Sequence, residues 1–296
     1  MRTLRTSCVA ALLLSWAIDA IATDTYAPRC AEPASDPSRI AVAGGSITEV
    51  LYALGAEHLL LAVDRTSNYP PAALGLPQVG YVRNLSAEGI LSMGPSLILG
   101  EDDMGPAEVL EQLSATGVEI RRLPEVHTAE GIVAKVRCVS NIIGLSADQQ
   151  ASSLSRLDGV LQDLQTVAQR KTEQVPRVAI LLTLDDGVPT AGGADTSANG
   201  VIEMAGGHNV FTDFEGWKPV SLEAMAAADP EFIIMPERGV QNSGGRNGVL
   251  NHPAIKLTTA GQSGQLIAID GMSLLGFGPR TLQVALNLSE TLQQAP

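Results

Sequence analysis

Short apolar runs that alternate with amphipathic stretches dominate the chain from residue 39 onward. In the first half these runs occupy residues 39–43, 59–63 and 97–99, and residues 118–123 predict a further strand, with helical patterns between them. Apolar runs of this length predict buried strands, and strands that alternate with helices are typical of a parallel α/β sheet. Residues 47–54 predict one such helix, with Ser46 as a candidate N-cap and Gly55 as its end.

The same pattern restarts near residue 178. Apolar runs at 178–182, 232–235 and 266–269 predict three more strands, and residues 196–205 predict a helix. The intervening residues 146–171 contain one glycine and no proline, begin with a Ser146/Gln149 capping box, and carry one stripe of apolar side chains. A helix of 26 residues is about 39 Å long. We interpret it as a rigid connection between two lobes; an ordinary long surface helix is the alternative.

A weak internal repeat supports two related lobes. Residues 85–99 align with residues 220–234 at an offset of 135, and Ser86 and Glu88 of the first stretch coincide with Ser221 and Glu223 of the second. Each stretch predicts a short capped helix, a turn at proline and a buried strand. The predicted fold is therefore α/β, with two Rossmann-like lobes that have parallel sheets and are joined by one long helix. The expected boundaries are 39–145 for the N-terminal lobe, 146–172 for the linking helix and 173–296 for the C-terminal lobe.

The N-terminus has the features of an export signal. Two arginines, Arg2 and Arg5, precede an apolar run at 9–18 that is too short to span a bilayer, and small residues at 20 and 22 predict cleavage after Ala22. Residues 1–22 are therefore expected to be a signal peptide. Residues 23–38, rich in Pro, Ser and Asp, are expected to be an N-terminal tether. These features predict an exported protein that is soluble once the signal is removed. We also expect the protein to be periplasmic and monomeric.

The net charge argues against one class of function, and the cysteine content raises the question of a disulfide. The formal net charge is −13, and about −14 without the signal, so the chain is a poor candidate for nucleic-acid binding. Two cysteines lie beyond the signal, Cys30 and Cys138. A disulfide between them would close a loop of about 108 residues and contribute about 4–5 kcal/mol at most. Two free buried thiols are equally consistent with the sequence.

The clearest candidate for chemistry is Tyr81 with Arg83, just before a predicted helix start. In an extended segment, residues i and i+2 point to the same side, so a phenol and a guanidinium would face one ligand. A phenolate suits Fe(III), and tyrosine is a known axial haem ligand. An arginine nearby favours the ionised phenol and can pair with a carboxylate. The alternative is a half-buried tyrosine beside a solvated arginine.

Four stretches together carry a family resemblance: residues 43–49 (AGGSITE), 80–89 (GYVRNLSAEG), 237–240 (ERGV) and 275–281 (LGFGPRT). From about Arg39 to the C-terminus the chain resembles the haem-binding periplasmic substrate-binding proteins of bacterial haem ABC importers, in which one long helix joins two α/β lobes. The resemblance implies a binding protein, not an enzyme, that captures ferric haem between its lobes and delivers it to a permease dimer at the inner membrane for iron acquisition.

The resemblance also implies roles for individual residues. The family's tyrosine ligand falls on Tyr81, its nearby arginine on Arg83, and a second arginine, from the other lobe, on Arg238. The docking carboxylates fall on Glu88 and Glu223. Some members carry an added histidine ligand after the first strand of the second lobe, but residues 183–187 contain none, which puts a second haem held there in doubt.

Other candidates come from loops that follow predicted strands, where open α/β sheets bind ligands. Tyr69 is expected to stack on or hydrogen-bond the ligand, or else to pack on Pro70. His127 could be a sixth iron ligand, although a loop or capping role is the commoner one. Arg280 is expected to be structural. Corrinoids and iron–siderophores are alternative ligands on this scaffold. An exported hydrolase is less consistent, because there is no Gly-x-Ser-x-Gly elbow, Walker loop or Cys-x-x-Cys motif.

Overall fold

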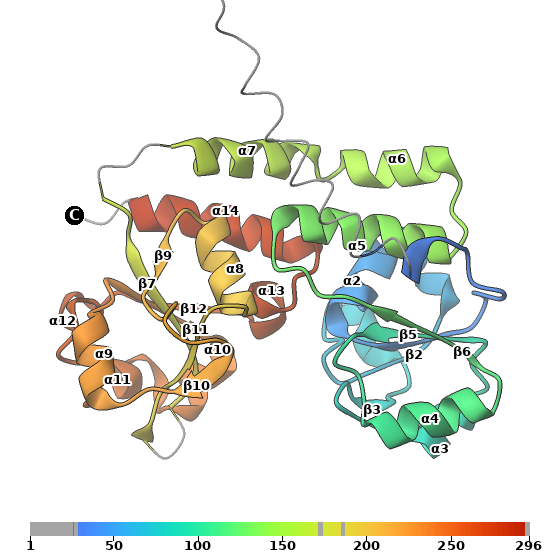
Figure 1. The fold of residues 1–296 in the computed structure, drawn as a ribbon, viewed down its shortest axis with the longest axis horizontal. Helices are drawn as coiled ribbons and strands as arrows, with labels where there is room; N and C mark the ends of the chain where they lie inside the picture. The colour runs from blue at the N-terminus through green and yellow to red at the C-terminus, as the bar shows by residue number, and fades with distance from the viewer. Residues whose placement is uncertain (1–25, 27–28, 171–173, 185–186, 294–296) are drawn as a thin grey trace, which may run out of the picture.

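The first lobe is built on a sheet of four parallel strands in the order β2-β1-β5-β6 (Figure 1). The computed structural model describes Tyr26 and residues 29–170, 174–184 and 187–293. The predicted strands are present with shifted ends: β1 (Ile40–Ala43), β2 (Leu60–Val63), β5 (Leu97–Glu101) and β6 (Glu119–Leu123). The helices and 3-10 turns of this lobe are α2 (Gly45–Ala53), η1 (Glu57–Leu59), η2 (Pro71–Gly75), α3 (Ala87–Leu91), α4 (Ala107–Ala115) and α5 (Ala129–Ile142).

The second lobe has a mixed sheet, which differs from the parallel sheet expected. Strands β9 and β11 pair with β7 in parallel, and β12 pairs with β11 in parallel. Strand β8 instead runs antiparallel to β7, and β10 runs antiparallel to β8. Only residues 184–189 separate β7 from β8, and a parallel crossover needs a dozen or more residues. The strands are β7 (Arg177–Thr183), β8 (Thr190–Gly192), β9 (His208–Asn209), β10 (Trp217–Pro219), β11 (Phe232–Pro236) and β12 (Leu266–Ile269).

Seven helices of the described residues belong to the second lobe. They are α8 (Ser197–Met204), α9 (Leu222–Ala228), α10 (Glu237–Asn242), α11 (Gly245–Leu250), α12 (Thr259–Ser263), α13 (Gly271–Leu275) and α14 (Pro279–Gln293). In Figure 1, α14 and α5 lie end to end above the two sheets, and the linking helices lie in a second row above them. The molecule therefore consists of two α/β lobes, as the sequence pattern predicted, beneath a two-row layer of helices.

The connection between the lobes consists of two collinear helices in place of the single predicted helix. Helix α6 (Ala147–Ser155) begins with the predicted capping box of Ser146 and Gln149, and α7 (Asp158–Gln169) follows after a break. At the break the N–H of Leu157 bonds to the carbonyl of Leu154, three residues back, over 2.8 Å. Leu157 packs against the hydrophobic cores of both lobes, so the turn tightens where the connection passes from one lobe to the other.

Alternating strand residues build a core on each face of each sheet. In β1, Ile40 and Val42 face the helices α2 and α5, whereas Ala41 and Ala43 face the opposite cluster with Ile90 and Leu113. The same alternation in β7 divides its residues between two further clusters. Because both faces of the sheets are covered, the central strands are almost entirely apolar, which is why short continuous apolar runs identified them. The edge strand β6 differs, because it contains Glu119, Arg121 and Arg122.

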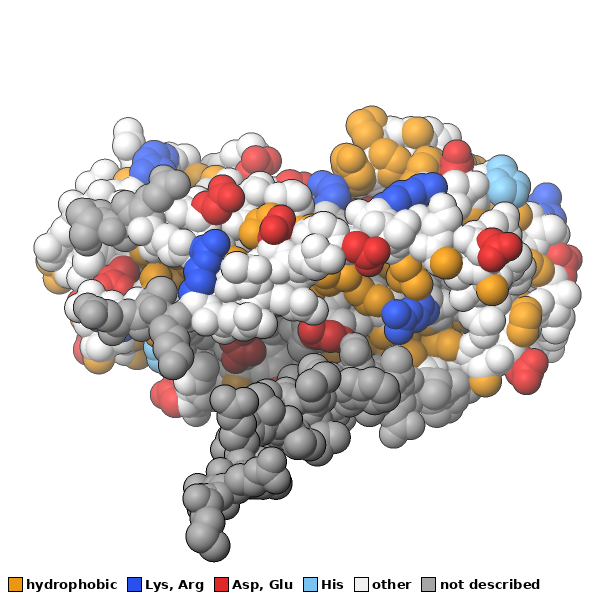
Figure 2. All heavy atoms as spheres, turned by 90° about the horizontal axis from the view of Figure 1, so that it is seen from above, with side chains coloured by type: hydrophobic (Ala, Val, Ile, Leu, Met, Phe, Trp, Pro, Cys, Tyr) orange, Lys and Arg blue, Asp and Glu red, His pale blue; other side chains and the backbone are white. Residues whose placement is uncertain are grey.

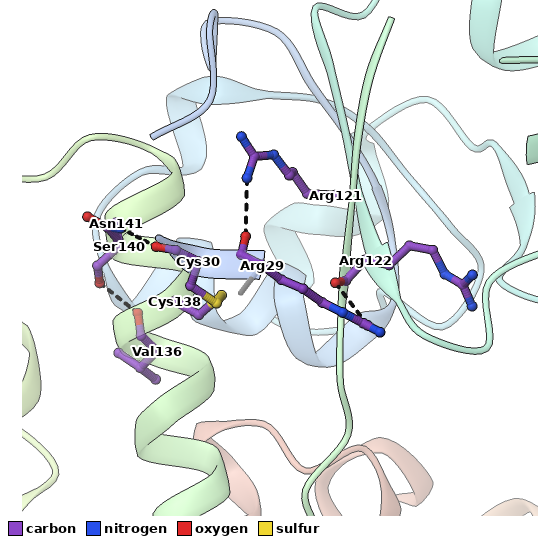
Figure 3. The surroundings of a disulfide bond; sticks show 8 residues. All are labelled: Arg29, Cys30, Arg121, Arg122, Val136, Cys138, Ser140 and Asn141. Carbon is purple, nitrogen blue, oxygen red and sulfur yellow. Dashed lines mark hydrogen bonds between the residues drawn. A yellow bond between two sulfur atoms is a disulfide. The ribbon is translucent and has the colours of Figure 1, made fainter. Parts of the chain in front are cut away.

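The described part of the expected tether is attached to the first lobe. Cys30 and Cys138 form a disulfide that joins this segment to α5, and Figure 3 shows Arg29 and Cys30 against α5 and β6. The Asn141 amide donates a hydrogen bond to the Cys30 carbonyl, and the Ser35 N–H donates to a Glu119 carboxylate oxygen over 2.8 Å. The disulfide, one of the two states the sequence left open, closes a loop of 108 residues. The predicted signal peptide lies outside the described residues.

The outer face of the helical layer carries no concentrated charge of one sign. Figure 2 shows acidic and basic side chains scattered among neutral ones, with apolar side chains between them. None of the helices in the described ranges combines the length and the apolar character needed to cross a membrane. The candidate functional side chains predicted from the sequence, Tyr81, Arg83, His127 and Arg238, lie instead on the inner walls of the two lobes.

Candidate ligand-binding cleft

A cleft of about 910 Å³ separates the inner walls of the two lobes. The first lobe contributes residues that follow β2, β5 and β6, and the second contributes residues that follow β11 and β12. These are the carboxyl ends of parallel strands, the expected place for a ligand in an open α/β sheet. The volume lies near the upper end of the range for small-molecule sites. Tyr81, Arg83, His127 and Arg238 all line this cleft.

Tyr81 and Arg83 meet through a tight hairpin. Strand β3 (Gly80–Tyr81) pairs antiparallel with β4 (Asn84–Leu85), and residues 82 and 83 form the turn. The Arg83 guanidinium donates a hydrogen bond to the Tyr81 hydroxyl over 2.7 Å. The sequence argument assumed an extended segment; the turn brings the two side chains together instead. A Cβ on Gly80, whose φ is +106°, would lie 2.8 Å from the Asn84 carbonyl oxygen, so only glycine fits this reversal.

A buried carboxylate, Asp64, holds this hairpin in place. One of its oxygens accepts a hydrogen bond from the N–H of Val82, which lies between Tyr81 and Arg83. Asp64 also accepts from the N–H of Gly44, from both the N–H and the hydroxyl of Thr66, and from the hydroxyl of Ser67, at 2.8–3.1 Å. The side chain is fully buried. Five donors compensate the cost of burying this charge and tie the hairpin to the end of β2.

The Arg83 guanidinium bridges the phenol to a third group. It forms an ion pair of 2.5 Å with Asp103, in the loop after β5. Partial burial lowers the pKa of Arg83, but the charges and hydrogen bonds of Asp103 and Tyr81 outweigh it and raise that pKa above its ordinary value. The guanidinium thus lies between the Asp103 carboxylate and the Tyr81 hydroxyl and places a positive charge 2.7 Å from the phenol oxygen.

On the opposite wall of the cleft, Arg238 has few contacts with neighbouring side chains. Arg238 lies on α10, a six-residue helix that begins where β11 ends. Its side chain is exposed, and within the described part of the chain it has no hydrogen-bond or ion-pair partner. The guanidinium is therefore free to pair with an anionic group in the cleft.

His127 lies at the junction of the two lobes. Its ring packs edge-on against Phe277 of the second lobe, with centroids 4.9 Å apart, and its Nε2 lies 3.6 Å from a carboxylate oxygen of Glu125. The side chain lines the cleft but is engaged on both sides. Burial raises the pKa of Glu125, but the close contact with His127 and the charge of Lys135 outweigh it and lower that pKa.

Tyr69 does not line the cleft. Its ring lies under the Arg280 guanidinium, with the guanidinium carbon 3.9 Å from the ring centroid. Arg280, at the start of α14, also pairs with buried Glu49 of the first lobe over 2.6 Å and with Asp270 of its own lobe over 3.1 Å. Arg280 thus connects the lobes, in keeping with its expected structural role, and Tyr69 belongs to that contact.

A buried polar chain behind the cleft wall was not identified from the sequence. Lys135 on α5 donates to the hydroxyl of Ser46 over 2.9 Å, and that hydroxyl donates to Glu101 over 2.6 Å. Lys135 is 1 % exposed, and Glu101 lines the cleft. Ser46, expected to cap α2, is an internal residue of that helix. The available signal was Lys135 itself, which shares an apolar helical stripe with Ile132, Val136 and Val139.

Glu88 and Glu223 occupy equivalent places in the two lobes and do not line the cleft. Each lies in the first turn of a short helix, α3 or α9, whose N-cap serine accepts a hydrogen bond from the third helical N–H over 3.1 Å. Both glutamates are exposed. The hydrogen bonds of Glu223 with its own backbone and with Ser221 lower its pKa. The repeat thus produces one exposed carboxylate on each lobe.

The cleft lining contains one phenol, and its carboxylates and its histidine are dispersed over both walls. Among the described residues there is no group of three or more His, Cys, Asp or Glu side chains able to hold a metal ion. A ligand that brings most of its own metal coordination, such as a porphyrin or corrin, suits a single protein donor better than a bare ion does.

The chain belongs to the periplasmic binding protein family, whose pattern matches residues 40–272. The vitamin B12-binding protein of Photorhabdus laumondii subsp. laumondii is 30% identical over 200 residues, which is 67% of this chain and 70% of that protein. Two solved structures have the same fold. The periplasmic haem-binding protein BhuT, in complex with two haems, is 34% identical, with a TM-score of 0.81 over 86% of this chain and 98% of that one.

The second is the periplasmic haem-binding protein HutB of Vibrio cholerae, 32% identical with a TM-score of 0.77 over 87% of this chain and 99% of that one. The resemblance inferred from the four sequence stretches is therefore confirmed at the level of family and fold. The family comprises binding proteins of the periplasm, which agrees with the predicted class and location.

Proposed function

We propose that the protein captures ferric haem in the cleft with Tyr81 as iron ligand and passes it to an ABC importer permease. The observation that carries this proposal is the Tyr81 hydroxyl held 2.7 Å from the Arg83 guanidinium inside a cleft between two lobes. The structural similarity to proteins that bind haem supports the same ligand. A transported haem needs no catalytic group in the cleft.

The proposed contacts divide between the lobes. Tyr81 supplies the phenolate, and Arg83 and Arg238 supply positive charge to the phenolate or to the haem propionates. His127, at the lobe junction, is the available sixth ligand. Tyr69, stacked under Arg280, would contact only a ligand that extends beyond the described cleft lining.

We propose a single haem per protein. BhuT is described with two haems, but residues 183–187 here contain no histidine that could ligate a second iron. Of these, 185 and 186 lie outside the described residues. Glu88 and Glu223, one exposed carboxylate on each lobe, are proposed to contact the two halves of the permease.

A corrinoid is the second candidate, because the relative from Photorhabdus laumondii is a vitamin B12-binding protein. The two ligands place different demands on the cleft, since a corrinoid does not need a phenolate on its metal. Tyr81 therefore separates them.

The test is the Tyr81→Phe variant, which keeps the ring and removes only the ligating oxygen. Wild type should bind haem with the absorption of tyrosinate-ligated ferric iron, and the variant should lose that band and most of its affinity. Tyr52→Phe, on α2 and away from the cleft lining, is the matched control and should behave as wild type. An unchanged spectrum in Tyr81→Phe, or binding of cobalamin but not haem by wild type, would refute the haem assignment.

A further inference from the structure

The cleft carries more negative than positive charge, although haem brings two carboxylates of its own. Glu101, Asp103 and Glu125 line the first wall, and the second wall adds Asp195, Glu237 and Asp270. The cationic side chains among the lining residues are Arg83 and Arg238, and Asp103 already pairs with Arg83. An anionic ligand that enters this cleft is therefore repelled by the carboxylates unless at least one of them is protonated or paired with a positive charge.

Glu101 is the carboxylate best placed to be neutralised. Its side chain packs against Gly44, whose Cβ position would lie 2.6 Å from the carboxyl carbon, so no other residue at 44 leaves room for it. One carboxyl oxygen accepts from the Ser46 hydroxyl. Within the described residues, the second oxygen has no hydrogen-bond partner, and the residue lines the cleft with 8% exposure. A protonated Glu101 can donate from that oxygen to a carboxylate in the cleft.

The groups around Glu101 act in opposite directions. Burial raises its pKa most, and the charges of Glu125 and Asp103 raise it further, whereas Lys135 and the Ser46 hydrogen bond lower it; the result is about 8. Tyr26 of the N-terminal segment faces the same cluster, and burial together with Glu125 and Glu101 raises the pKa of its phenol. Asp102 also raises the pKa of the Tyr26 phenol, and Asp64 accepts a hydrogen bond from the N–H of Gly44, against which Glu101 packs.

We propose that Glu101 is a ligand-facing residue of the cleft that takes up a proton when an anionic ligand binds, with Ser46 and buried Lys135 holding its carboxyl group in place. The proposal rests on the proposed function, because haem supplies the negative charge. It also explains the buried Lys135, which compensates the carboxylate in the empty cleft without contacting it directly. Lys135 and Ser46 are positioning residues, and Glu101 contacts the ligand.

The experiment counts the protons exchanged on binding. Isothermal titration calorimetry at pH 8 in two buffers of different ionisation enthalpy gives the proton count for haem and for iron-free protoporphyrin IX, which has the same propionates but needs no phenolate. Because Glu101 is about half protonated at pH 8, it can take up at most about half a proton. Wild type should take up several tenths of a proton more per porphyrin than Glu101→Gln does, by about the same amount with either porphyrin.

The matched control is Asp195→Asn, which removes an exposed carboxylate from the opposite wall at a left-handed residue that asparagine tolerates. Its proton count should equal that of wild type. Ser46→Ala is the second variant: loss of its hydrogen bond raises the pKa of Glu101 further, so its proton uptake should be smaller than that of wild type.

A measurement without ligand tests the same residue. A carboxyl group whose pKa is raised in the folded state stabilises the protein below the ordinary pKa and loses that contribution as the pH rises through the folded value. The melting temperature of wild type relative to Glu101→Gln should therefore fall between about pH 5 and pH 8. A constant difference across this range overturns the proposal.

The outcomes of the binding experiment are distinct. Equal proton counts for wild type and Glu101→Gln with a bound porphyrin overturn the proton uptake and leave the proposed function standing. If neither porphyrin binds to wild type, the proposed function fails and the proton uptake fails with it. Equal loss of uptake in Asp195→Asn would also overturn the assignment to Glu101, because the effect would then belong to cleft charge in general.

Discussion

The two walls of the cleft differ in how firmly they hold their functional side chains. On the first wall Tyr81, Arg83 and Asp103 form a connected row. Buried Asp64 accepts a hydrogen bond from Val82 of the hairpin, and four further donors outside the hairpin hold the Asp64 carboxylate in place. On the second wall Arg238 stands exposed on a six-residue helix, without a partner in the described structure. The first wall is organised before a ligand arrives, whereas the second can adjust to it. Substitutions should therefore affect folding and binding together on the first wall, but only binding on the second.

The strongest way to break this comparison is Asp64→Asn. The new amide nitrogen cannot accept hydrogen bonds, so buried donors that now point at Asp64 lose their partner, at about 1–3 kcal/mol each. We expect a loss of several kcal/mol in the free energy of unfolding, and the melting temperature to fall by about 2–4 °C for each kcal/mol. Haem affinity should fall as well, because the hairpin loses its anchor.

Chemical denaturation and haem titration of the same sample measure both effects. Asp163→Asn, an exposed aspartate on α7, is the matched control and should change neither quantity appreciably. If Asp64→Asn is as stable as wild type and binds haem normally, the hairpin is positioned by other contacts and the contrast between the walls is lost.

The two arginines sharpen the comparison at smaller cost. Charge-assisted hydrogen bonds contribute about 1.5–3 kcal/mol, so Arg83→Ala and Arg238→Ala should each weaken haem binding about ten- to a hundred-fold. The Arg83–Asp103 pair is largely exposed, so its loss should reduce stability by about 1 kcal/mol at most. Arg238→Ala should leave stability unchanged.

Haem titration with thermal melting separates these cases. Arg137→Ala, an exposed arginine on α5 outside the cleft lining, is the control for loss of one positive charge. Wild-type binding in both cleft variants would show that the arginines are surface residues, and the proposed charge assistance would then be wrong.

The smallest effect on the isolated protein is expected at Glu88 and Glu223. Replacing both with lysine should leave haem binding and the melting temperature nearly intact while abolishing delivery of haem to the permease in reconstituted vesicles. Two weak exposed contacts held at a fixed separation act together through effective concentration. Glu108→Lys, an exposed glutamate in the first turn of α4, serves as the control for charge reversal near a helix N-terminus. A double variant that melts several degrees lower and still delivers haem would show that both glutamates serve only their helices.

Local sequence determined the elements and their caps. The apolar runs identified the principal strands of both sheets because those strands are buried on both faces. Three of the predicted caps form: Ser146 with Gln149 at α6, Ser86 at α3 and Ser221 at α9 each accept the expected hydrogen bond. The fourth prediction was wrong, because Ser46 lies within α2 and the N-cap is Gly44. Caps and strands depend on neighbours within a few residues, so their pattern is visible in the chain itself.

Tertiary structure alone decided how the cleft is supported. Asp64 reaches Val82, Ser46 reaches Glu101, and Lys135 reaches back 89 residues to Ser46. The sequence also left undecided whether Cys30 pairs with Cys138, and it did not predict that strands β8 and β10 run antiparallel to their neighbours. Each depends on which residues folding brings together across the sequence. Periodicity shows which face of an element is buried, but it carries no information on which buried polar groups will meet there.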